Sequence, residues 1–133
     1  MRAEGAGKPL SFELQPGQRH ESMAFEALME RGAVKQPRPG RPRLRPKRIA
    51  ADKAYSNRRI REYLRRKRIR VTIPRKANER RGGRFDKEVY KLRARVEQLI
   101  NRLKQFRRIA TRYEKRADNY LGMVTIGAIL LYL

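Results

Sequence analysis

The stretch KRIAADKAYSNRRIREYLRRKRIRVTIPR, residues 47–75, determines the fold that we expect for this chain. Its first part, RIAADKAY, begins as an apolar strand and runs out into a polar tip, whereas its last part, IRVTIPR, is rich in β-branched residues and stops at Pro74. Between them, SNRRIREYLRRKR predicts a helix with Ser56 as N-cap and with Ile60 and Leu64 on one face. The order strand, helix, strand predicts a βαβ unit, and therefore a parallel pair of strands with a right-handed crossover.

Asp52 lies at the C-terminal end of the first of these strands. Ligands of open α/β sheets gather at that edge, so a carboxylate there is well placed to hold a metal ion. An aspartate that ends a strand is also a common turn or helix-cap residue, and that structural role stays open as an alternative.

A second segment, EVYKLRARVEQLINRLKQFRRIATRYEK at residues 88–115, predicts a long amphipathic helix over residues 86–117. Steps of three and four residues place an apolar seam along it, formed by Val89, Leu92, Val96, Leu99, Leu103, Phe106, Ala110 and Tyr113. A stripe beside this seam contains Tyr90, Arg93, Glu97 and Lys104. An ordinary solvated helix with a weak Arg93–Glu97 ion pair would give the same stripe, so the pattern alone does not assign a function.

The charge of the chain restricts its partners. The 133 residues include 36 lysine and arginine residues against 13 acidic ones, for a formal net charge of +23. The excess lies after residue 33, and it predicts binding to a polyanion, above all nucleic acid, through released counterions. A membrane surface is the weaker alternative. The chain has no cysteine, which excludes disulfides and thiolate metal sites and fits a reducing compartment.

We expect three regions along the chain. Residues 1–33 predict a short strand near 9–15 and a helix near 22–31, and residues 34–48 predict a linker rich in proline and arginine, either solvated or touching DNA. Residues 49–133 contain the βαβ unit, the long helix and an apolar C-terminal helix in YLGMVTIGAILLYL. That last segment has 14 uncharged residues, short of the roughly 20 that a membrane span needs. We therefore expect it to be buried or to bind a partner, without stable membrane association.

Several blocks of the sequence resemble the DDE transposases of bacterial insertion sequences, in the same order. The spacing Y-(2)-R-(3)-E-(6)-K, which stands here as Tyr90, Arg93, Glu97 and Lys104, is similar to the signature of one group of these enzymes. The other blocks are GKPLSFELQPGQRHES, GRPRLRP, ADKAYSNRRIREYLR, the dipeptide IP and FRRIATRYEK. Together the resemblance covers residues 5–133.

This resemblance implies an α/β, RNase H-like fold and a two-metal Mg²⁺ site that cuts and rejoins DNA at transposon ends. Carried over by position, Asp52 would be the second acidic metal ligand and Glu97 the third. Lys104 and Arg93 would contact DNA phosphate, and Tyr90 would support that stripe. Such an enzyme would act in the bacterial cytoplasm, with the nucleoid.

The resemblance also predicts a gap in the catalytic site. The first metal-binding aspartate of the family lies on a strand that precedes the block GKPLSFEL, and here only a short lead-in comes before that block. Glu4, within the lead-in, is not expected to replace it. We therefore expect an incomplete RNase H-like fold, inactive alone, that is either a truncated remnant or one half of a split transposase with an upstream partner. The strand near 9–15 would then lack its usual neighbour.

Two other functions stay open at this point. A non-catalytic basic nucleic-acid-binding protein fits the composition, and a helical regulator that pairs through residues 89–113 would need an exposed seam. Asp52 and Glu97 separate these possibilities. Only the transposase hypothesis predicts that their carboxylates lie at the same edge of the sheet, within about 12 Å of each other, where both can reach ions shared with phosphate.

Overall fold

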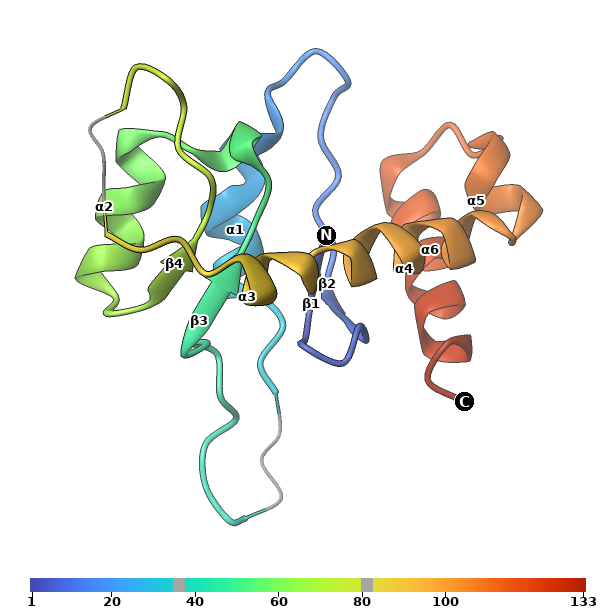
Figure 1. Ribbon diagram of the computed structural model, residues 1–133. Coiled ribbons are helices and arrows are strands. Elements are labelled where there is room, and N and C mark those ends of the chain that lie inside the picture. Colours follow the sequence, from blue (N-terminus) through green and yellow to red (C-terminus); the bar gives the residue numbers. More distant parts are fainter. Residues whose placement is uncertain (35–37, 80–82) are drawn as a thin grey trace.

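The buried side chains of the fold form two small clusters. A helical path over residues 87–104 runs between the parts of the chain that carry them (Figure 1). The computed structural model describes residues 1–34, 38–79 and 83–133. The strands of this part of the chain are β1 (Arg2–Ala3), β2 (Pro9–Ser11), β3 (Arg48–Ala50) and β4 (Arg70–Thr72). The helices are η1 (Glu21–Ala24), α1 (Phe25–Glu30), η2 (Lys53–Tyr55), α2 (Arg58–Arg66), α3 (Lys87–Lys91), α4 (Ala94–Lys104), α5 (Arg107–Thr111) and α6 (Ala117–Leu130), where η marks a 3₁₀ helix.

The predicted βαβ unit is present, and the α/β class is confirmed. Strands β3 and β4 are parallel, with Ile49 opposite Val71, and α2 crosses between them. Ile60 and Leu64 on α2 are both 0% exposed. With Tyr63 of the same helix, they form the first cluster together with Phe25 and Met29 of α1 and with Ile69 and Ile73 on either side of β4. Burial of one face of α2 against this parallel pair holds the unit together.

The start of α2 differs from the prediction by one residue. Its N-cap is Asn57, whose side chain accepts a hydrogen bond from the backbone N–H of Ile60 at 2.9 Å. Ser56 is fully buried and its hydroxyl instead contacts the carboxylate of Glu79 at 2.8 Å. Asparagine and serine cap helices equally well, so the cap preference alone does not choose between Ser56 and Asn57. The contact of Ser56 with Glu79 leaves Asn57 as the cap.

The predicted helix over 86–117 is wrong as one piece, because the segment forms α3, α4 and α5. Between α3 and α4 the backbone tightens into 3₁₀-type bonds, such as that from Arg93 N–H to Tyr90 O at 3.0 Å, so the helical path continues. A real break comes at Phe106, which is extended at ψ 108°. Beyond it α5 turns away and the chain folds back as α6 (Figure 1). The fold-back covers apolar side chains that a straight helix would leave in water.

The second cluster lies inside this fold-back. Leu99 and Leu103 of the predicted seam are 2% and 5% exposed, and they pack with Ile109, Val124 and Ala128 of α5 and α6. Gly127 allows the close approach, since a Cβ there would lie 2.8 Å from Cδ1 of Ile109. The centre of the seam is therefore used within the chain, which removes the helical regulator that needed it exposed. Tyr113, at the end of the seam, is 68% exposed.

The strand expected near 9–15 is shorter, and it is paired. β2 forms an antiparallel pair with β1, with Arg2 opposite Ser11. Ala3 and Phe12 pack against the second cluster, while the guanidinium of Arg2 donates to backbone oxygens of Met29 at 3.1 Å and of Arg31 at 2.9 Å, at the end of α1. β1 therefore pairs one edge of β2, and the hairpin ties the two clusters together.

The apolar C-terminal helix is α6, with 14 residues. Its Val124, Gly127 and Ala128 are buried, while Ile126, Ile129 and Leu130 are at least half exposed. Within the described ranges, no helix has both the length and the apolar character needed to cross a membrane.

Truncation of the α2 face should test the first cluster. Leu64→Ala is expected to lower the free energy of unfolding by about 2–5 kcal/mol, because it removes a fully buried side chain and leaves a cavity. Ile129→Ala, at a position that is 56% exposed, is the matched control and should change it by less than about 0.5 kcal/mol. Urea unfolding followed by circular dichroism gives both values. Equal midpoints for the two variants would contradict the assignment of Leu64 to the core.

Candidate functional site

Asp52 occupies the C-terminal edge of the parallel β3–β4 pair. It follows β3 by two residues and is the N-cap of η2, where Oδ1 accepts a hydrogen bond from the N–H of Ala54 at 3.3 Å. Its side chain is 51% exposed and its second oxygen, Oδ2, is turned toward Arg93. Asp52 therefore has the helix-cap role that was considered as an alternative, and this role uses only Oδ1. Oδ2 remains available for a second interaction.

Arg93 joins Asp52 to Glu97. Its Nη1 lies 2.6 Å from Oε1 of Glu97, one helical turn further along the chain, and 3.5 Å from Oδ2 of Asp52. Because both oxygens contact the same nitrogen, they cannot be further apart than the sum of these two distances. The structure therefore brings the two predicted carboxylates to one place, although 41 residues separate Asp52 from Arg93.

The guanidinium of Arg93 is held from a second side by aromatic rings. Its carbon Cζ lies 5.4 Å from the centroid of the Tyr90 ring, and that ring packs against Phe85 at 5.3 Å. A cation over the face of a tyrosine is stabilised by the ring quadrupole. Tyr90 thus supports Arg93 directly, and Phe85 supports Tyr90.

Asp86 anchors this end of the helical path on the sheet. Its Oδ1 caps α3 by accepting from the N–H of Val89 at 3.0 Å, and its Oδ2 accepts from Arg48 of β3 at 2.7 Å. These two interactions, with the hydrogen bond to Val89 the larger, lower the pKa of Asp86. Asp86 and Arg48 were missed from sequence. The N-cap was detectable from an aspartate just before a helix, but nothing in the sequence pairs it with Arg48.

Lys104 extends the stripe but lies outside this cluster. It is the last residue of α4 and is exposed, seven residues beyond Glu97 on the same side of the helix. Seven residues of helix correspond to about 10 Å along the axis. Lys104 is therefore placed to meet a long ligand that also passes Glu97.

The electrostatics of the cluster are dominated by Arg93. Its hydrogen bond to Glu97 raises the pKa of Arg93, and partial burial opposes that shift. Its Nε is buried and, in the residues that the structure describes, has no hydrogen-bond partner. The guanidinium is thus partly desolvated, and two carboxylates compensate for this cost.

The chemistry of this pair fits a divalent ion with hard oxygen ligands, such as Mg²⁺. The Arg93 guanidinium occupies the place that such a cation would take, so the space between Asp52 and Glu97 stabilises positive charge. Over residues 1–34, 38–79 and 83–133, no group of three histidine, cysteine or acidic side chains could hold a metal. An ion bound between these two carboxylates would have to share their oxygens with Arg93 or replace it.

Comparisons with known proteins identify the family of the chain. The family model of the transposase DDE domain matches residues 3–133. The chain therefore belongs to the transposase DDE domain family. A protein of Brucella ovis, described as a candidate transposase for insertion sequence element IS6501, is 31% identical over 87 residues, which are 64% of this chain and 66% of that protein. No solved structure matches the chain.

Removal of the Arg93 charge should strengthen metal binding at the pair. Two unit charges 4 Å apart interact by about 4 kcal/mol at an effective dielectric constant of 20, so Arg93→Gln is expected to raise the affinity for Mn²⁺ by at least about tenfold. Paramagnetic resonance of free Mn²⁺ during a titration measures this. Arg102→Gln, which removes an exposed charge from the same helix α4, is the matched control and should have little effect.

The double variant Asp52→Asn with Glu97→Gln checks where the ion binds. It should abolish the binding gained by Arg93→Gln, since both oxygen ligands are then neutral. If Arg93→Gln binds Mn²⁺ no more tightly than the unchanged chain, the guanidinium and the ion do not compete for one place.

Proposed function

We propose that this chain is part of an insertion-sequence transposase and carries the second and third acidic residues of its catalytic site. The observation that carries the proposal is the meeting of Asp52 and Glu97 on one guanidinium, at the C-terminal edge of a parallel strand pair. The transposase DDE domain family, matched over residues 3–133, supports it. The substrate would be the DNA at the ends of the element, and the protein would act with the nucleoid in the bacterial cytoplasm.

Each residue of the cluster has a role in this proposal. Asp52 and Glu97 would hold Mg²⁺, which in a two-metal site activates the attacking oxygen and stabilises the leaving oxygen of an in-line displacement. Arg93 would turn from the carboxylates to a DNA phosphate, whose oxygens suit the planar guanidinium. Tyr90 would keep the guanidinium at the edge of the site during this exchange, and Lys104 would bind a further phosphate along the same helix.

A third acidic ligand would have to come from another segment. The two further carboxylates at the start of this helical path already have partners: Asp86 caps α3 and binds Arg48, and Glu88 binds Lys91. Glu79 is likewise bound to Ser56 and Arg61. We therefore propose that the chain alone binds DNA without cutting it, and that a partner carrying the family's first acidic residue completes the site.

Cleavage should therefore depend on complementation. With Mg²⁺ or Mn²⁺, the chain alone is expected to leave supercoiled plasmid DNA that carries element ends intact, because two ligands hold the ions poorly. Addition of a fragment with the family's first acidic residue should give nicks, scored on agarose gels. Asp52→Asn and Glu97→Gln should each remove this activity, and Glu62→Gln, at an exposed ion pair on α2, should retain it.

Two outcomes would contradict this scheme. Cleavage by the chain alone that disappears in Glu97→Gln would show that a third ligand lies within it, with Glu4 and Glu13 the first to test. Complemented activity that survives both Asp52→Asn and Glu97→Gln would remove these residues from the reaction.

Binding to DNA should be strong, general and sensitive to salt. With a net charge of +23, log affinity for duplex DNA of any sequence should fall linearly with log salt, and a slope of about −5 would correspond to six phosphate contacts. Fluorescence anisotropy at several salt concentrations measures it. In metal-free buffer, Asp52→Asn should not weaken binding, because it removes negative charge near the phosphate. Binding that does not respond to salt would remove the argument from charge.

A non-catalytic nucleic-acid-binding protein is the second candidate, and Arg93 favours it, because its guanidinium neutralises both carboxylates in the absence of an ion. The complementation experiment separates the two functions. A protein that only binds would bind DNA as expected and never support cleavage.

A further inference from the structure

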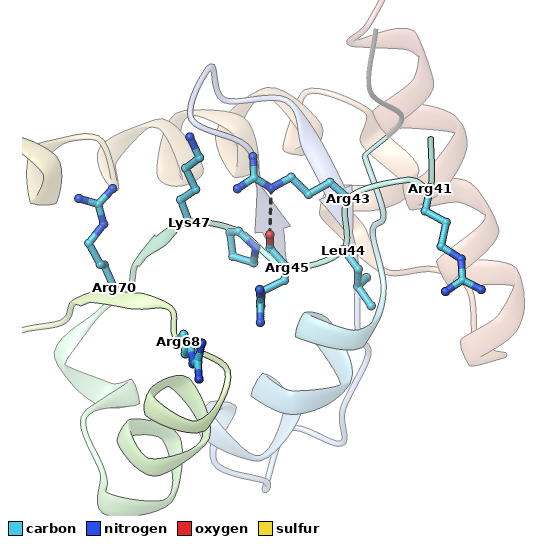
Figure 2. Close-up of a pocket in the computed structure, with 8 residues that line it drawn as sticks. Arg41, Arg43, Leu44, Arg45, Lys47, Arg68 and Arg70 are labelled. Atoms are coloured by element: carbon cyan, nitrogen blue, oxygen red, sulfur yellow. Dashed lines mark hydrogen bonds between the residues drawn. The ribbon is translucent and has the colours of Figure 1, made fainter. Parts of the chain in front are cut away.

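A basic hollow lies at the other end of the β3–β4 pair from Asp52. It has a volume of about 920 Å³ and opens between the loop that enters β3 and the turn that enters β4 (Figure 2). Its cationic residues are Arg41, Arg43, Arg45, Lys47, Arg68 and Arg70. All six are exposed, and no acidic residue lines the hollow.

The cations of this hollow differ in their partners from three other arginines, which lie on β3, on α2 and between α3 and α4. Arg48, Arg61 and Arg93 each have a carboxylate within 3.5 Å. None of the six cations of the hollow takes part in an ion pair with any residue that the structure describes. Their mutual repulsion is therefore compensated only by solvent, and an anion in the hollow would relieve it.

The loop that carries four of these cations is held in place by hydrogen bonds. Val34 and Arg43 exchange two backbone bonds of 2.9 and 2.7 Å, the backbone oxygen of Leu44 accepts from Arg2 at 2.8 Å, and that of Lys47 accepts from Arg70 N–H at 3.1 Å. The side chain of Arg43 also donates to the backbone of Arg45 at 3.1 Å (Figure 2). Residues 38–48, the described part of the predicted linker, are anchored at these points, so binding of a ligand would cost little ordering of the backbone.

Arg68 is in a backbone conformation that favours glycine. Its φ is 55°, because it ends α2 in a Schellman motif: Ile69 N–H bonds to Leu64 O, and Arg68 N–H bonds to Arg65 O, both at 2.9 Å. A side chain in this left-handed region costs roughly 1 kcal/mol relative to glycine. An arginine at this position therefore stabilises the fold less than glycine would. The backbone strain is tolerated at a position where the side chain lines the hollow with a positive charge.

We propose that this hollow binds the sugar–phosphate backbone of duplex DNA, as a contact separate from the Asp52–Glu97 pair. The two lie at opposite ends of β3, since Lys47 precedes the strand and Asp52 follows it. Exposed guanidinium and ammonium groups match phosphate oxygens and do not read base edges, so the contact is independent of sequence. The choice of DNA as the polyanion rests on the proposed function, and the contact would hold the duplex while its scissile phosphate lies at the other edge.

The test compares two triple variants of equal charge. Arg41→Gln, Arg45→Gln and Arg68→Gly remove three cations from the hollow, and Arg107→Gln, Arg108→Gln and Lys115→Gln remove three exposed cations at and after α5. The hollow variant should reduce the magnitude of the salt slope for duplex DNA by about 3, one for each lost phosphate contact. It should also weaken binding at low salt by at least about tenfold, and the control should change the slope by less than about 1. Equal changes in both variants would overturn the inference, because charge alone would then explain them.

The single variant Arg68→Gly separates binding from folding. Its thermal midpoint should stay the same or rise, since glycine relieves the left-handed strain, while the salt slope falls by about 1. A lower midpoint, or an unchanged slope, would show that Arg68 serves the fold and not a ligand.

Binding of the same variants to other polyanions identifies the ligand of the hollow. Binding of DNA by the unsubstituted chain distinguishes failure of this inference from failure of the proposed function. Single-stranded RNA and vesicles of anionic lipid should lose no more affinity in the hollow variant than in the control. A larger loss with either of them than with duplex DNA would overturn DNA as the ligand. If the unchanged chain binds no DNA at low salt, the proposed function fails as well. If it binds DNA and the two triple variants behave alike, only the hollow is excluded.

Discussion

The contact of Arg93 with Asp52 and Glu97 is the interaction on which the arrangement of the site depends. One carboxylate belongs to the end of β3 and the other to α4, so the guanidinium fastens the long helical path to the βαβ unit. Asp86 makes a second fastening to Arg48 of β3, about two helical turns earlier. Each of these solvent-exposed ion pairs contributes little to the free energy of folding, because water screens the charges. Together they fix the direction of α3 and α4, and the apolar side chains of the two clusters supply the larger share of the free energy of folding.

The two ends of the parallel strands differ in charge. At their C-terminal end Asp52 and Glu97 share Arg93, whereas at their N-terminal end only Arg48 is paired, with Asp86, and the six cations of the hollow form no ion pair with any described residue. A short parallel pair has two different ends. The proposed metal site and the proposed phosphate contact would therefore use different ends of one small sheet.

The sequence predicted the local units well and their mutual packing poorly. The βαβ unit could be recognised because Ile60 and Leu64 repeat at helical spacing between two apolar strands that end in turn residues. The division of the 86–117 helix could not, since the same apolar spacing describes a straight helix and one that folds back at Phe106. The pairing of β2 with β1 was missed because β1 has two residues and no recognisable pattern. For the site, the stripe of Tyr90, Arg93 and Glu97 was visible in the sequence, whereas the bond from Arg93 to Asp52 depends on tertiary structure.

The position of Arg93 also explains how two neighbouring carboxylates can be accommodated when no metal ion lies between them. Two carboxylates held close together repel each other, and each raises the cost of ionising the other unless a cation lies between them. An arginine supplies that cation within the chain, and its guanidinium stays charged at any physiological pH. The same group has a second suitable partner in a phosphate, so the arrival of DNA and the departure of Arg93 from the carboxylates would be coupled. In such a site the carboxylates would become available to a metal ion only when the phosphate that the ion must share is already present.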